Sequence, residues 1–141
     1  MHIAQSIYVS IRLFVILNNC CTLLIYIIAL QLWTLEQTCL PWVYKLAIKD
    51  ANQKFYLTVP VNASNGVNPT LEKEITTLSN HQQLWRLITS GDGANSMIQN
   101  YSVSSGGGLV LDTRSDIAGQ VTGMWERLDN DNQKWYITAT D

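Results

Sequence analysis

From residue 42 onward, apolar and polar residues alternate in short runs that are separated by clusters of turn-forming residues. The alternation is clearest in residues 42–50 and 55–61, and further short runs span 83–88, 97–103, 121–128 and 133–140. Gly, Asn, Ser and Asp fill the segments between these runs, as in residues 62–70 and 104–108. Short strands at steps of roughly ten residues, joined by such turns, predict an all-β sandwich or barrel.

The first 41 residues have a different texture, because Arg12 and Glu36 are their only charged residues. No charge interrupts Leu13–Leu35, and 23 residues in a helix span about 34 Å, enough to cross a hydrocarbon core of about 30 Å. We therefore expect residues 1–41 to form an apolar, helical segment that serves as a membrane anchor or is signal-like. Residues 42–141 then form a separate domain.

Three alternatives to a membrane anchor stay open for this segment. It can be a cleaved signal peptide, although its first twelve residues are weakly basic and no small-x-small cleavage site follows. It can also arise from an incorrectly assigned translation start. Finally, it can pack against the protein as a degenerate first repeat, since its Ile, Val, Leu and Tyr suit strands. Asn18 and Asn19 weaken the interpretation as a membrane span, because each would bury an amide in a membrane.

A Gln-x-Trp tripeptide occurs three times, at residues 31–33, 83–85 and 133–135. The steps of 52 and 50 residues are typical of an internal repeat. Residues two apart on a strand share a face, so Trp85 and Trp135 are expected to fill the core while the Gln amides bond to backbone groups. The repeat also favours loop and strand over helix for residues 71–78.

These residues carry a resemblance to the ricin B-type β-trefoil lectins. The resemblance covers residues 42–141 and rests on the repeated Gln-x-Trp, on Leu111–Asp112 upstream, and on Asn132 before the last Gln. It implies an all-β trefoil, in which Trp fills the core and each repeat can carry a sugar site. Only two repeats are clear: a first full repeat, which contains the Gln-x-Trp at 83–85, and a second full repeat, which contains the one at 133–135. We therefore expect a partial or degenerate trefoil behind the apolar segment.

In this family an Asp, an aromatic residue and an Asn form each sugar site. The resemblance implies such a site in the second full repeat, at Asp112, Trp125, Asn132 and Gln133. The first full repeat has Thr58, Ile75 and Gln82 at the positions matched by sequence, and the apolar segment has Ser10, Leu23 and Leu30. The expected number of sugar sites is therefore one.

The chemistry of the residues supports this choice. A carboxylate accepts strong hydrogen bonds from sugar hydroxyls, an Asn amide both donates and accepts, and an exposed indole covers the sugar C–H face. Structural roles remain open as alternatives: Asp112 as a turn residue, Trp125 as a core residue, and Gln133 as a bonding partner that holds the fold first.

Other classes of function find little support in the sequence. The net charge of −2 offers no basic stripe for nucleic acid. Three Cys without CxxC spacing give no zinc site, and residues 129–133 lack the Gly and Glu of a calcium loop. Without a nucleophile motif or a pair of catalytic acids, we expect neither a cofactor nor enzymatic activity.

The sequence therefore predicts a non-catalytic carbohydrate-binding module whose partners are glycans or glycoconjugates. The alternative is a protein-binding trefoil, such as a protease-inhibitor-like module, which has no reason to keep Asp112, Trp125 and Asn132 together. Membrane association through residues 13–35 and self-association at open strand edges are further expectations. The expected location is membrane-associated or secreted, or cytoplasmic if the N-terminal segment is not a targeting signal.

Overall fold

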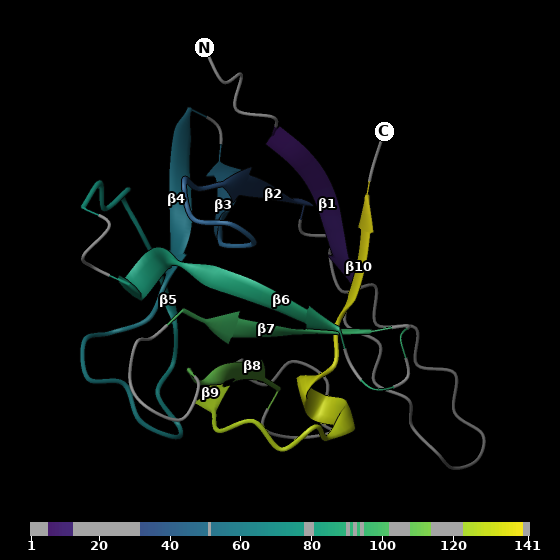
Figure 1. Cartoon of the computed structure of the whole chain (residues 1–141). Coiled ribbons are helices and arrows are strands. Elements are labelled where there is room, and N and C mark those ends of the chain that lie inside the picture. Colours follow the sequence, from purple (N-terminus) through teal and green to yellow (C-terminus); the bar gives the residue numbers. More distant parts are fainter. Residues whose placement is uncertain are drawn as a thin grey trace, which may run out of the picture.

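The fold is known from a computed structural model, which describes residues 6–12, 32–50, 52–77, 81–89, 91, 93, 95–101, 108–113 and 123–139. These residues form ten strands and two short 3-10 helices (Figure 1). The elements are β1 (Ser6–Arg12), β2 (Leu32–Gln37), β3 (Tyr44–Asp50), β4 (Gln53–Thr58), β5 (Thr70–Glu72), η1 (His81–Gln83), β6 (Trp85–Thr89), β7 (Ser96–Asn100), β8 (Val110–Asp112), β9 (Gly123–Trp125), η2 (Asp131–Gln133) and β10 (Tyr136–Ala139). The predicted all-β class is confirmed.

Six of the strands close into a ring. They follow one another in the order β10, β1, β2, β3, β6 and β7, each antiparallel to its neighbour. A single bridge between Ser96 and Trp135 joins β7 back to the residue before β10. Its two backbone hydrogen bonds measure 2.9 Å from Ser96 N to Trp135 O and 2.8 Å from Trp135 N to Ser96 O.

The other four strands form two hairpins outside this ring. β4 pairs with β5 in the first full repeat, and β8 pairs with β9 in the second. Each full repeat therefore has the same order: a ring strand, a hairpin, a 3-10 turn and a second ring strand. In Figure 1 the β8–β9 hairpin lies beneath β6 and β7.

The described parts of the first 41 residues are the strands β1 and β2 and the start of the turn after β2. The expected helix is therefore wrong for Ser6–Arg12 and for Leu32–Gln37. β1 and β2 pair with each other, and they also pair with β10 and β3. This is the arrangement expected of a degenerate first repeat. The remainder of the proposed anchor, residues 13–31, lies outside the described residues. Among the residues that are described, none belongs to a helix with the length and apolar character that a membrane span requires.

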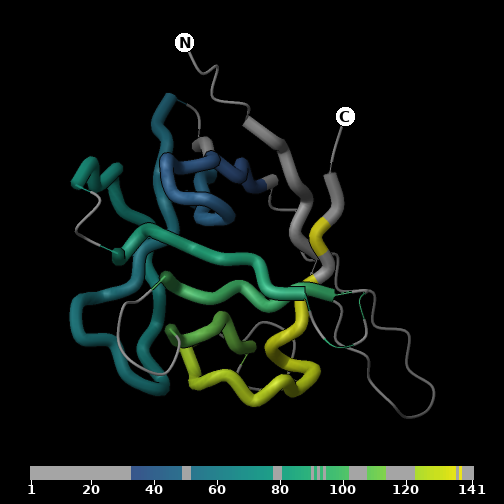
Figure 2. The backbone as a smooth tube through the Cα atoms, in the orientation of Figure 1, coloured from purple at the N-terminus to yellow at the C-terminus, as the bar shows by residue number. Residues whose placement is uncertain are grey.

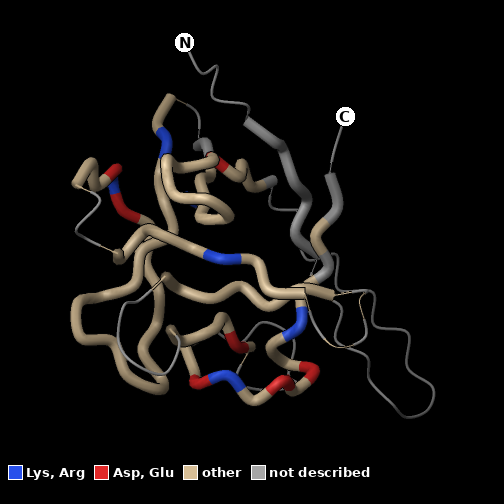
Figure 3. The backbone as a smooth tube through the Cα atoms, in the orientation of Figure 1, with Lys and Arg blue, Asp and Glu red and all other residues tan. Residues whose placement is uncertain are grey.

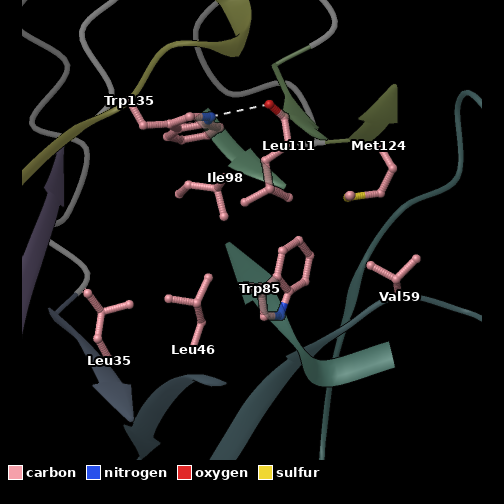
Figure 4. Close-up of a cluster of buried hydrophobic side chains, with 8 residues drawn as sticks. All are labelled: Leu35, Leu46, Val59, Trp85, Ile98, Leu111, Met124 and Trp135. Carbon is pink, nitrogen blue, oxygen red and sulfur yellow. Dashed lines mark hydrogen bonds between the residues drawn. The ribbon is translucent and has the colours of Figure 1, made fainter. Parts of the chain in front are cut away.

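The core contains side chains from the N-terminal strands and from both full repeats. Eight buried side chains form one cluster: Leu35, Leu46, Val59, Trp85, Ile98, Leu111, Met124 and Trp135 (Figure 4). Trp85 is fully buried and Trp135 is 7% exposed. Their indole N–H groups donate to the carbonyls of Leu57 at 3.0 Å and Leu111 at 3.2 Å. Each hydrogen bond fixes the indole against the hairpin of its own repeat, as a buried Trp requires.

Candidate functional site

The β8–β9 hairpin places Asp112 and Trp125 on the same face. Leu111 and Met124 are paired across the hairpin and both enter the core cluster, so their neighbours point to the opposite face. Asp112 lies opposite Gly123, and Trp125 lies two pairs further along, opposite Val110 and diagonal to Asp112. Because Gly123 has no side chain, the space opposite the carboxylate is not filled from β9. The indole of Trp125 is half-buried.

The 3-10 turn η2 brings Asn132 and Gln133 to the end of β8. Gln133 N donates to Asn130 O at 3.0 Å, which closes the turn. The carbonyl of Asn132 accepts from the backbone N of Thr113 at 3.0 Å, and the Thr113 hydroxyl lies 3.3 Å from the same oxygen. The turn is therefore tied to the residue that directly follows Asp112.

Two side-chain amides hold the Asp112 carboxylate. Asn132 Nδ2 donates to Oδ1 at 2.8 Å, and Gln133 Nε2 donates to Oδ2 at 2.9 Å. Asp112 is only 4% exposed, whereas Asn132 is half-buried. Hydrogen bonds to an ionised acceptor are stronger than neutral ones, so both oxygens are fixed in position. The predicted residues Asp112, Asn132 and Gln133 thus form one hydrogen-bonded group, with Trp125 beside it.

Gln133 also organises the loop that follows β9. Its Nε2 donates to the carbonyl of Glu126 at 2.8 Å, and its Oε1 accepts from the backbone N of Leu128 at 2.8 Å. The side chain is completely buried. The expectation that Gln and Trp share a face of one strand is wrong, because Gln133 and Gln83 lie in 3-10 turns and only the Trp residues begin the paired segments. Their amides nevertheless bond to backbone groups, as expected.

The first full repeat contains the same network with different residues. Gln83 Nε2 donates to Thr58 Oγ1 at 2.9 Å and to Lys73 O at 2.8 Å, and its Oε1 accepts from Ile75 N at 2.7 Å. Thr58 therefore occupies the place of Asp112. Its hydroxyl also donates to Tyr56 O at 2.9 Å, so it serves the hairpin itself.

Strand pairing corrects one sequence match. Trp125 lies opposite Val110, and the equivalent pair in the first full repeat is Glu72 opposite Tyr56. Glu72, and not Ile75, is thus the counterpart of Trp125. Ile75 corresponds to Leu128, since each donates its backbone N to the Gln of its repeat. Of the apolar-segment positions, Ser10 lies in β1, and Leu23 and Leu30 lie outside the described residues.

A loop of the first full repeat borders the site. The connection between β4 and β5 runs to β9, where Gly66 N donates to Met124 O and Met124 N donates to Val67 O, both at 2.8 Å (Figure 2). Asn65 Oδ1 accepts from Glu126 N at 2.7 Å. β9 is therefore held between β8 and this loop, which fixes the strand that carries Trp125.

Charged residues of both signs surround the site (Figure 3). Arg127 pairs with Asp129 at 3.1 Å, and Lys134 pairs with Asp131 at 3.1 Å. Such exposed pairs contribute little to stability. Within the described ranges, no three His, Cys, Asp or Glu side chains gather as a metal site would require. The carboxylate of Asp112, the amide of Asn132 and the indole of Trp125 offer hydrogen bonding and aromatic contact.

The sequence matches no protein-family model and no curated protein. Among solved structures, the chain is similar to a designed threefold-symmetric protein, ThreeFoil, with a TM-score of 0.61 and 21% sequence identity. The alignment covers 76% of this chain and 71% of ThreeFoil. At this identity the likeness concerns the fold alone, and the resemblance to ricin B-type lectins continues to rest on the residues. The chain has an all-β, trefoil-like fold.

Proposed function

We propose that the chain binds carbohydrate without catalysis, through one site on its second full repeat. In this proposal, Asp112 and Asn132 form hydrogen bonds with sugar hydroxyls, and Trp125 presents its indole to the C–H face of the ring. Gln133 holds the carboxylate from behind. Binding makes and breaks no covalent bond.

The observation that carries the proposal is the joint placement of Asp112, Asn132 and Trp125. Residues 20 positions apart in the chain meet through a 2.8 Å hydrogen bond, on the hairpin face that also carries the indole. Each carboxylate oxygen can accept more than one hydrogen bond, and an Asn amide has two N–H groups and an acceptor oxygen. The group can therefore keep its internal bonds while it engages neighbouring hydroxyls.

The first full repeat differs from the second at the positions of the proposed sugar site. It keeps the Gln network but has the hydroxyl of Thr58 in place of a carboxylate and Glu72 in place of the indole. Loss of both features removes the charge-assisted acceptor and the apolar stacking surface. This difference supports a single sugar site, in the second full repeat and not in the first.

The proposal is tested first on a broad glycan array with the full-length protein. Titration calorimetry then compares Trp125→Ala with its structural counterpart Glu72→Ala. We expect Trp125→Ala to abolish measurable sugar binding and Glu72→Ala to leave it unchanged. Because Trp125 is only half-buried, a thermal melt should show that the variant still folds. The proposal fails if no glycan binds, or if both variants bind sugar equally well.

Asp112→Ala gives the second measurement. Removing a charge-assisted acceptor costs roughly 1.5–3 kcal/mol, which corresponds to a roughly 10- to 150-fold weaker affinity. This variant also removes the carboxylate that accepts from both Asn132 and Gln133, so its stability is measured alongside. Thr58→Ala is an imperfect control, because the Thr58 hydroxyl is itself hydrogen-bonded to Gln83.

A further inference from the structure

The turn between β2 and β3 holds an exposed tryptophan in a conformation that suits glycine. Val43 N donates to Leu40 O at 3.2 Å, which defines a turn with Pro41 and Trp42 at its centre. Trp42 has φ = 62°, in the left-handed region that side chains with a Cβ atom rarely adopt. Pro followed by a residue of positive φ is the pattern of a type II turn, where Gly or Asn is usual.

The other described residues of positive φ are of types that tolerate it: Asn62 and Asp129, both at 58°, Gly66 at 94° and Gly93 at 70°. Among these described positions, Trp42 alone has a bulky side chain. Backbone strain of this kind persists where the surrounding structure enforces it, and it is concentrated at functional positions.

The turn is enforced by hydrogen bonds that do not involve the indole. Thr38 Oγ1 donates to Val43 O at 2.8 Å and accepts from Leu40 N at 3.1 Å, and Gln37 Nε2 donates to Leu40 O at 3.1 Å. The Trp42 side chain is 78% exposed, more than the other large apolar side chains of the described residues. Burial of the Trp42 side chain therefore contributes almost no free energy to offset the strain of its positive φ.

We propose that Trp42 is the anchor of a protein-binding site, and that its partner offers an uncharged apolar pocket that receives the indole. Tryptophan is enriched among the residues that dominate binding energy at protein interfaces. A turn that is already rigid loses little conformational entropy when a partner closes over it. Pro41, which is also exposed, extends the apolar tip.

The chemistry around Trp42 favours a protein pocket over a sugar or a membrane surface. Residues 37–43 contain no charged side chain. The Thr38 hydroxyl and the Gln37 amide N–H groups are engaged with backbone carbonyls of the turn, so the turn lacks the carboxylate found at Asp112. The nearest flanking charges, Glu36 and Lys45, belong to ion pairs with Lys54 and Glu74 and form no basic patch for anionic lipid.

The first test concerns the fold. Trp42→Asn places a residue that tolerates positive φ in the turn, so we expect a melting temperature equal to that of the wild type or higher by about 2–6 °C. Val61→Asn is the matched control, because Val61 is 68% exposed. A clear fall in the melting temperature of Trp42→Asn alone would overturn the proposal, since Trp42 would then serve the fold.

The second test concerns the partner. A benzophenone amino acid at the exposed position Cys39 crosslinks whatever covers the turn in extracts of cells that contain the full-length protein. The captured protein is purified and titrated against the wild type, Trp42→Asn, Trp42→Phe and Asp112→Ala. We expect Trp42→Asn to weaken binding at least tenfold, Trp42→Phe to weaken it less, and Asp112→Ala to leave it unchanged.

Four results would overturn the proposal. They are equal affinity of the captured protein for the wild type and Trp42→Asn, absence of any crosslinked protein, a crosslink only to a second copy of the chain, and Trp42-dependent binding to phosphatidylserine vesicles. Asp112→Ala separates this site from the sugar site, because loss of sugar binding with retained partner binding shows that the two act independently.

Discussion

Gln133 and Asp112 are joined by a 2.9 Å hydrogen bond from Nε2 of the amide to Oδ2 of the carboxylate. The bond connects the repeated Gln-x-Trp tripeptide with the candidate sugar site. Gln83 makes the equivalent bond to Thr58. The tripeptide thus serves the fold in both full repeats, and only in the second does it also hold a carboxylate.

The first prediction concerns this buried amide. Gln133→Ala should destabilise the protein by about 3 kcal/mol or more, because it removes the hydrogen bonds of Gln133 to Asp112, Glu126 and Leu128, each at a cost of about 1–3 kcal/mol. Urea unfolding measures the loss. Gln53→Ala, at an exposed position of β4, is the control and should change stability by less than about 0.5 kcal/mol. A loss below about 1 kcal/mol for Gln133→Ala would contradict the role assigned to it.

The second prediction transfers the site. The triple variant Thr58→Asp, Glu72→Trp and Gln82→Asn places the Asp, Trp and Asn of the second repeat on their structural counterparts in the first. Gln83 already points its amide at position 58. For a glycan that binds the wild type, we expect the stoichiometry in calorimetry to rise from one to two. The same variant with Ile75→Trp in place of Glu72→Trp, built on the sequence match, should remain at one.

The third prediction concerns alkaline pH. Burial raises the pKa of the Tyr56 hydroxyl above its ordinary value near 10, and its 3.0 Å hydrogen bond to Glu36 raises it further. The unfolded chain therefore loses this proton first, and the stability from Tyr56 is complete below pH 10 and declines as the pH rises beyond it. Chemical unfolding between pH 8 and 11 should show a steeper decline for the wild type than for Tyr56→Phe. Parallel curves would show that Tyr56 contributes nothing to the pH dependence.

The fourth prediction concerns the N-terminal strands. Removal of residues 1–41 exposes the edges of β3 and β10, which pair with β2 and β1 in the intact fold. Exposed strand edges pair with other chains, so the fragment 42–141 should self-associate. Sedimentation and thermal melts of the fragment measure this. A monomeric fragment that melts cooperatively would show that the ring is not needed for stability.

The all-β class and the two full repeats could be predicted from the sequence, because the Gln-x-Trp tripeptide recurs at a regular spacing. The spacing of Trp85 and Trp135 fixed the register of two repeats, and alternation located most of their strands. Strands in the first 41 residues were only an alternative to a membrane helix, because an apolar run such as Leu13–Leu35 has the same appearance in a buried strand and in a membrane helix. Only pairing with strands far along the chain distinguishes the two.

The sequence named the residues that the structure brings together around Asp112, but it matched Trp125 with the wrong residue of the first full repeat. Counting ten residues back from each Trp matched Trp125 with Ile75, but the connection from β5 to η1 is longer than that from β9 to η2, which shifts the true counterpart to Glu72. Sequence also gave no indication of Trp42. The alternating run 42–50 begins with Trp42, whereas β3 begins only at Tyr44. The sign of φ at Trp42 and the exposure of its indole depend on how the turn is held.

The pairing of β1 with β10 has a consequence for how the protein is made. Val9 pairs with Ala139, so a strand near the start of the chain and a strand near its end are neighbours in the ring. Such distant contacts carry a large loop-closure entropy and slow folding. During translation, β1 has no permanent neighbour on that side until β10 has left the ribosome. The nascent chain must therefore keep this edge from pairing elsewhere while all the residues between β1 and β10 are synthesised.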